Sequence, residues 1–143
     1  MKRLLVGGYE LDDDPRRVDI DAVHGFLSRH AYWAIGRGHE QQIELNLAAA
    51  RIIGLYRRER QLGYARAVSD GVSVAYLADL FVLPEARGLG LGAEIVAEMV
   101  ERGPLAHVWW LLHTKDAHGL YERFGFSAPA RSVLERPPQV SRR

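Results

Sequence analysis

The feature of this sequence that most restricts its fold is a glycine-rich turn between an apolar run and an amphipathic stretch. Residues 72–82 are nearly continuous in apolar side chains, which is typical of a central strand covered on both faces. Pro84 ends that run, and glycines follow at Gly88, Gly90 and Gly92. Apolar residues from Ile95 onward then recur at helical spacing. The segment therefore predicts a strand, a loop and a helix in succession.

The glycine turn is suited to an anion. Glycines let backbone N–H groups converge without obstruction by Cβ atoms, and the start of a helix adds the positive end of its dipole. A P-loop is excluded because Ala93 and Glu94 follow Gly92, where Lys and Ser or Thr would be needed. Residues 88–93 match a dinucleotide fingerprint formally, but the next apolar run ends at His113 without the carboxylate that would bind a ribose. A diphosphate of another kind fits the turn, and the alternative is a glycine-rich turn that serves only to change the direction of the chain.

Helical periodicity and β-rich runs frame this turn. We expect four helices, at residues 20–30, at 40–49, directly after the glycine turn, and at about 116–124. Asp19 can cap the first of them, and Gly125 ends the last. Residues 51–56, 62–68 and 72–82 predict an antiparallel meander, 108–112 a further buried strand, and 132–135 a last strand. Residues 137–143 are expected to be a tail.

Composition excludes several functional classes. The 143 residues, 48% hydrophobic and 26% charged, suit one soluble domain, and no apolar run approaches the roughly 20 residues of a membrane span. The net charge is +1 without a basic block interleaved with aromatics, which argues against a nucleic-acid partner. Without cysteine, no acyl-cysteine intermediate or disulfide can form. The N-terminus lacks the apolar core of a secretory signal, so we expect a cytoplasmic protein.

Two segments together resemble a known family. Residues 80–92 resemble the acetyl-CoA motif of the GNAT acetyltransferases, a strand followed by Arg/Gln-x-x-Gly-x-Gly/Ala at a helix start. Residues 116–126 are similar to that family's C-terminal Asn-x-x-Ala-x-x-Leu-Tyr-Glu-x-x-Gly-Phe element. The similarity covers roughly residues 64–126. It implies an α/β (α+β) GNAT acyl-CoA N-acyltransferase fold over a single domain, 1–143, with a mixed, mostly antiparallel, twisted sheet of about six to seven strands and about four helices.

The resemblance also implies how acetyl-CoA, the co-substrate, is held. The backbone of Phe81, Val82 and Leu83 would pair with the pantetheine arm as an extra strand. The pyrophosphate would be bound by backbone N–H groups of Arg87, Gly88, Leu89, Gly90, Leu91 and Gly92. At Asp116 the chain departs from the family, which often carries asparagine there. Asp116 is still expected to contact the cofactor in that residue's place, but a carboxylate can accept and cannot donate a hydrogen bond there.

Three tasks of acetyl transfer can be assigned to residues. By resemblance, Tyr121 is the general acid that protonates the departing thiolate, although a tyrosine that only packs beside Phe124 and Phe126 is the alternative. The backbone N–H near Val82 would polarise the thioester carbonyl. Asp79, late in the central strand, is the candidate base, because partial desolvation there would raise its pKa.

Other assignments of the base remain open. Asp79 could instead simply bond neighbouring backbone or an arginine. Tyr76, Glu44 and a water chain compete for the role. Tyr76 and Asp79 face opposite sides of an ideal strand, so a bulge is needed for both to point into one site.

The loop between the first two predicted helices is expected to line the acceptor pocket. Tyr32, Trp33 and Arg37 lie there, and an aromatic wall could bind an alkyl or cationic amine, although core packing would explain the aromatics as well. His113 and His118 lack the companions of a metal site, so we predict no metal.

The expected function is transfer of acetyl from acetyl-CoA to a primary amine of a small molecule or peptide, by direct attack. Alternatives are O-acylation, a larger acyl donor, a non-catalytic CoA-binding regulatory module and a structural interaction domain. We expect no membrane partner, and by analogy with the family a homodimer.

Overall fold

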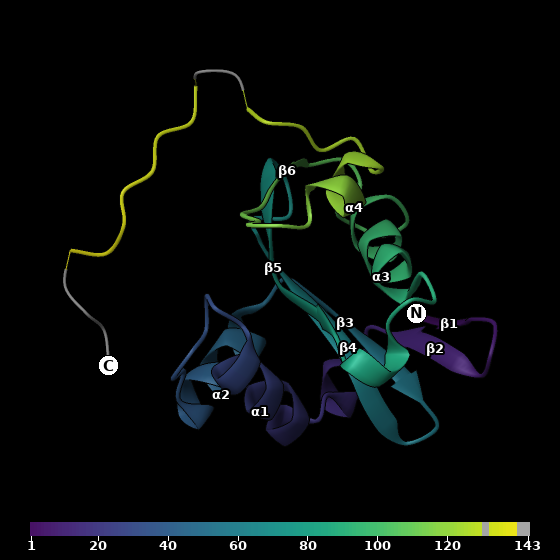
Figure 1. The fold of residues 1–143 in the computed structure, drawn as a ribbon. Helices are drawn as coiled ribbons and strands as arrows, with labels where there is room; N and C mark the ends of the chain where they lie inside the picture. Colours follow the sequence, from purple (N-terminus) through teal and green to yellow (C-terminus); the bar gives the residue numbers. More distant parts are fainter. Residues whose placement is uncertain (130–131, 140–143) are drawn as a thin grey trace.

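A six-stranded sheet forms the centre of the computed structural model, which describes residues 1–129 and 132–139 (Figure 1). Neighbouring strands pair antiparallel except β5 and β6, which are parallel. The predicted mixed, mostly antiparallel sheet is therefore confirmed. In spatial order, which is also sequence order, the strands are β1 (Lys2–Leu4), β2 (Tyr9–Asp12), β3 (Arg51–Arg57), β4 (Arg60–Ser69), β5 (Val74–Val82) and β6 (Trp109–Leu111).

The α-helices of these described residues begin and end close to their predicted bounds. The Asp19 side chain caps the first of them by accepting a hydrogen bond from the Ala22 N–H at 3.1 Å. Short 3-10 turns precede α1 (η1, Pro15–Arg17) and follow β5 (η2, Pro84–Ala86). The α-helices are α1 (Ile20–His30), α2 (His39–Ala48), α3 (Leu91–Val100) and α4 (His118–Glu122).

The helices cover the two faces of the sheet, α1 and α2 on one side, α3 and α4 on the other (Figure 1). Because side chains alternate along a strand, Ile52 of β3 packs with Val23 and Leu27 of α1. Its neighbour Ile53 packs with Ile95 of α3 on the opposite face. The sheet is thus sealed by apolar contacts on both faces, and the site must lie where strands or helices diverge.

A β-bulge interrupts β5 in its second half. Tyr64 pairs with Phe81 and Arg66 with Ala78, so two residues of β5, Asp79 and Leu80, oppose one residue of β4. Asp79 occupies the left-handed region with φ of +59°, which is rare for a residue other than glycine. The bulge changes the alternation, so that Asp79 lies on the α1–α2 face together with Tyr76.

Three sequence predictions need correction or completion. The buried strand predicted at 108–112 is only three residues long, and Trp109 is 75% exposed, because β6 is the edge of the sheet. Residues 132–135 form no strand. The hairpin of β1 and β2 was missed. Of the predicted tail, 137–139 have no regular secondary structure, and 140–143 lie outside the described residues.

No helix within residues 1–129 and 132–139 is long and apolar enough to cross a membrane.

Candidate active site

The glycine turn leads from η2 into α3. Gly88 and Gly90 have φ of +81° and +75°, and Gly90 is the residue that caps α3. A Cβ built on either glycine would meet nothing within 4 Å, so the concave side of the turn is open. In the described part of the chain, no group accepts a hydrogen bond from the backbone N–H groups of residues 88–92. These free donors at the start of a ten-residue helix form a cradle that fits a phosphate.

One side chain connects this cradle to the end of β5. Arg87 donates from Nε to the Val82 carbonyl at 2.8 Å. The bond holds the first residue of the glycine turn against the last residue of the strand. The predicted pyrophosphate site and the predicted pantetheine site are therefore continuous.

The edge of β5 that faces β6 is open beyond Tyr76. Strand β6 pairs only with Val74, Ala75 and Tyr76 of β5. On the other edge, the Leu83 N–H donates to the Leu62 carbonyl at 2.8 Å. Because an antiparallel ladder alternates, the N–H and C=O of Val82 then point away from β4, toward the open edge.

Only one of the three residues predicted to pair with the pantetheine arm has its backbone free to do so. The backbone of Phe81 is turned toward β4, and the Leu83 carbonyl accepts from the Ala86 N–H at 2.9 Å. Of the three predicted residues, Val82 alone presents its backbone to the open edge. Its N–H is available, while its carbonyl already accepts the Arg87 bond.

Tyr121 lies on α4 on the same side of the sheet as α3 and packs edge-on against Phe126, with ring centroids 5.9 Å apart. Its hydroxyl has no hydrogen-bond partner among the described residues. Burial, with smaller effects of Tyr32 and Asp116, raises the pKa of Tyr121 to about 12. The phenol is therefore protonated at neutral pH, as a general acid must be. Asp116 itself is exposed, two residues before α4 begins.

Asp79 is held by three donors. Trp33 donates from Nε1 to Oδ1 at 2.8 Å, and Arg37 Nη1 and Arg66 Nε donate to Oδ2 at 2.8 and 2.7 Å. Burial acts to raise the pKa of Asp79, but the hydrogen bonds and charges of Arg37 and Arg66 outweigh it and hold the pKa below its ordinary value. The expected rise in pKa was wrong. A carboxylate in this state is a weak base, and the alternative that Asp79 bonds an arginine describes its contacts.

The structure brings the predicted acceptor loop to this bulge. Trp33 and Arg37 are attached to β5 because both donate a hydrogen bond to Asp79. Tyr32 packs edge-on against Trp33 with centroids 5.1 Å apart, and the Lys115 ammonium lies 5.4 Å from the centre of its ring. Tyr32 is also close enough to influence the pKa of Tyr121. The loop thus joins the β5 bulge to the segment that leads into α4.

Sequence reasoning missed a buried polar network beneath the loop. Arg37 donates to Gln42 at 3.0 Å, Gln42 donates to Asn46 at 3.1 Å, and the Tyr64 hydroxyl donates to Asn46. Arg66 is a charged residue in the middle of an otherwise buried strand. This position could have indicated a buried ion pair from the sequence, because arginine is rarely buried without a partner.

A second chain of polar contacts also escaped the sequence analysis. Tyr76 Oη lies 2.5 Å from His113 Nδ1, and His113 Nε2 lies 2.6 Å from Glu135 Oε2. Because an ionised carboxylate can only accept, Nε2 carries the proton and Nδ1 accepts from the Tyr76 hydroxyl. Tyr76, on the α1–α2 face of β5, is thereby connected to the surface.

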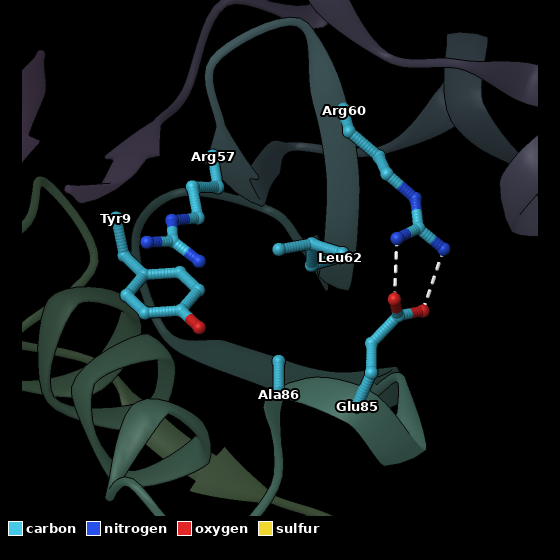
Figure 2. A pocket seen from close by; sticks show the side chains of 6 residues that line it. All are labelled: Tyr9, Arg57, Arg60, Leu62, Glu85 and Ala86. Atoms are coloured by element: carbon cyan, nitrogen blue, oxygen red, sulfur yellow. Dashed lines mark hydrogen bonds and ion pairs between the residues drawn. The ribbon is translucent and has the colours of Figure 1, made fainter. Parts of the chain in front are cut away.

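A separate pocket lies behind the glycine turn. Figure 2 shows its lining, Tyr9, Arg57, Arg60, Leu62, Glu85 and Ala86. Arg60 binds Glu85 with both Nη groups and so fastens η2 to β4. The pocket contains no predicted site residue. The Arg60–Glu85 pair at its edge anchors η2, after which the glycine turn begins. Within residues 1–129 and 132–139, no group of three His, Asp or Glu side chains could hold a metal ion.

Comparisons with known proteins point to one family. The acetyltransferase (GNAT) domain matches residues 48–128. A curated protein of Gibberella zeae, provisionally named an acetyltransferase, is 28% identical over 133 residues, covering 78% of this chain and 75% of its own length. A crystal structure from Xanthomonas campestris pv. campestris, provisionally named an acetyltransferase of the GNAT family, is 32% identical with a TM-score of 0.86, covering 91% of this chain and 93% of its own.

A predicted acetyltransferase from Clostridium acetobutylicum, crystallised with acetyl-CoA, shares the fold at 15% identity with a TM-score of 0.68, and 96% of each chain is covered. The matched domain spans more than half of the sequence and includes the meander, the glycine turn and α4. The chain therefore belongs to the GNAT acetyltransferase family.

Proposed function

We propose that this chain is an acetyl-CoA-dependent N-acetyltransferase that transfers acetyl to a primary amine of a small molecule or peptide by direct attack. The observation that carries the proposal is the open edge of β5. This edge includes Val82 and lies next to the free amides of the glycine turn, so one extended cofactor could contact both. Tyr121, whose hydroxyl is unpartnered in the described chain, lies on α4 on the same side of the sheet as α3. Family membership supports acetyl-CoA as donor, and the open glycine cradle fits its pyrophosphate.

The donor end of the reaction needs two groups. When bound, acetyl-CoA supplies an activated thioester. The Val82 N–H, turned to the open edge, is placed to polarise a carbonyl there, a contact worth about 3 kcal/mol when its geometry is good. The Tyr121 phenol donates its proton to the departing sulfur. With a pKa of about 12, it is then readily reprotonated from water.

The acceptor end needs a route for one proton. Since Arg37 and Arg66 make Asp79 a weak base, the Tyr76–His113 contact is the better route. The amine proton passes to Tyr76 Oη while the Tyr76 proton passes to His113 Nδ1, and Glu135 stabilises the resulting imidazolium. Without a cysteine in the chain, attack by the amine is direct.

Two measurements test the proposal. Calorimetry should detect binding of coenzyme A, and thiol release from acetyl-CoA should depend on an added amine. Tyr121→Phe should lower kcat on the order of 10²-fold while CoA affinity and melting temperature stay unchanged, because the hydroxyl makes no hydrogen bond in the described structure. Tight CoA binding without turnover of any amine would instead favour a regulatory CoA-binding module. Absence of CoA binding would reject both.

A further inference from the structure

A buried cluster beside the β5 bulge carries unequal charge. Arg37 and Arg66 both donate to Oδ2 of the single carboxylate of Asp79. Arg66 is 9% exposed, Asp79 is 5% exposed, and the Arg37 side chain keeps 12% of its surface. Two guanidinium groups against one carboxylate leave a net charge of +1. Removing an unbalanced charge from water is costly, so such a cluster calls for an additional anion.

The two arginines also keep unused donors. Both Nη groups of Arg66, and Nε and Nη2 of Arg37, have no acceptor among the described residues. The side-chain atoms that are sealed from solvent without a partner there are Asn46 Nδ2, Arg51 Nε and the Tyr56 hydroxyl. The arginine donors are not among them, so they reach solvent although their residues are mostly buried. These donors are therefore accessible to a small anion from solvent.

Neighbouring groups reinforce the positive character. Lys115 adds a positive charge beside Tyr32. The nearby carboxylate of Glu135 pairs with His113, and Asp79 is already bound by Trp33 and both arginines. An incoming anion would thus meet free guanidinium donors rather than a competing free carboxylate.

The cluster lies on the acceptor side of the proposed reaction. Asp79 precedes Val82 by three residues, which is at most about 10 Å along the bulged strand. Trp33 and Arg37 belong to the loop that reaches toward Tyr121. A molecule of amino-acid size could span from the guanidinium groups to a thioester at the open edge.

We propose that Arg66 and Arg37 bind a carboxylate of the acceptor, so that the amines acetylated are amino acids or other small amino-carboxylates. This rests on the proposed N-acetyltransferase function. A planar guanidinium fork matches a carboxylate with two parallel hydrogen bonds. The positive site also disfavours a protonated amine, which helps to keep the nucleophile neutral.

The test compares three forms of each acceptor: the amino acid, its carboxamide and its decarboxylated amine. The carboxamide keeps the shape but loses the charge. We expect kcat/KM for the amino acid to exceed that for the carboxamide about 100-fold, because hydrogen bonds to charged groups are lost. Arg66→Gln should remove that preference, so that the amino acid and its carboxamide are turned over with equal kcat/KM, and Arg66→Lys should retain part of it. Arg16→Gln is the matched control, because the Arg16 side chain is 89% exposed and lies outside this cluster.

Each other outcome is decisive. Equal or faster turnover of carboxamides and decarboxylated amines would overturn the carboxylate site but leave the acetyltransferase standing. Preference for phosphoethanolamine over amino acids would also overturn it. If no acceptor is turned over, calorimetry should be used to measure whether the amino acid binds to the CoA-bound protein. Binding that Arg66→Gln abolishes, with CoA affinity retained, would support the site, and no binding would reject it.

Discussion

Arg66 on β4 donates from Nε to Asp79 Oδ2, 2.7 Å away, at the point where β5 bulges. This contact fixes the bulge on the α1–α2 face of the sheet, because Arg37 and Trp33 bind the same carboxylate. The predictions below separate the structural role of this pair from the chemistry around it.

Asp79→Asn should destabilise the fold by about 3 kcal/mol at pH 7, because it leaves two mostly buried guanidinium groups without a counter-charge. The native pKa of Asp79 is held below the ordinary 3.8, so its contribution is complete above about pH 4 and is lost as pH falls through the native value. Urea denaturation at pH 7 and at lower pH measures the difference. Asp21→Asn, at a 90% exposed side chain, is the control. A variant equally stable at pH 7 would contradict the structural role.

Gly90→Ala should weaken coenzyme A binding roughly tenfold, about 1.4 kcal/mol. Its φ of +75° strains any other residue, so the free amides shift, and unfolding becomes easier by about 1 kcal/mol. Gly71→Ala is the matched control, with φ of +79°, nothing within 4 Å of the new Cβ, and a position in the turn before β5. It should lose the same stability and keep its affinity in calorimetry. Equal affinity in both variants would show that the turn does not hold the cofactor.

His113→Gln should lower kcat on the order of 10²-fold if the amine proton leaves through Tyr76. Tyr76→Phe should have a similar effect, and the double variant should be little worse than either, since both break one chain of hydrogen bonds. Stopped-flow or steady-state thiol release measures this. The exposed His107→Gln is the control. Additive losses would indicate two independent roles, and unchanged rates would leave the amine to lose its proton directly to water.

Glu98→Gln should destabilise the protein by about 3 kcal/mol, because the 1% exposed Glu98 on α3 binds Arg3 of β1 at 2.5 Å and lies 3.6 Å from Arg51 of β3. Glu94→Gln, on the same helix with a 40% exposed side chain, should change stability little. Thermal unfolding of the two variants makes the comparison. Equal melting temperatures would mean that the apolar face of α3 holds the helix alone.

Sequence alone predicted the elements with strong periodicity or specific caps. Asp19 capped α1, and the run 72–82 became β5 with the glycine turn after it. The β1–β2 hairpin was missed because strands of three and four residues carry too little pattern. The pKa of Asp79 was predicted in the wrong direction because its partners lie 13 and 42 residues away and meet it only in the folded sheet. Exposure at Trp109 likewise depends on β6 being the last strand, which no local signal reveals.

The extra residue at Asp79 and Leu80 has a consequence for how this sheet can vary. Deleting one residue there would rotate the whole preceding half of β5 by one position, so that Tyr76 would face the apolar layer under α3 and Leu77 would face the acceptor loop. The residue count of β5 and the set of side chains that face α1 and α2 are therefore coupled. Single exchanges of side chains preserve this arrangement, whereas an insertion or a deletion at the bulge does not.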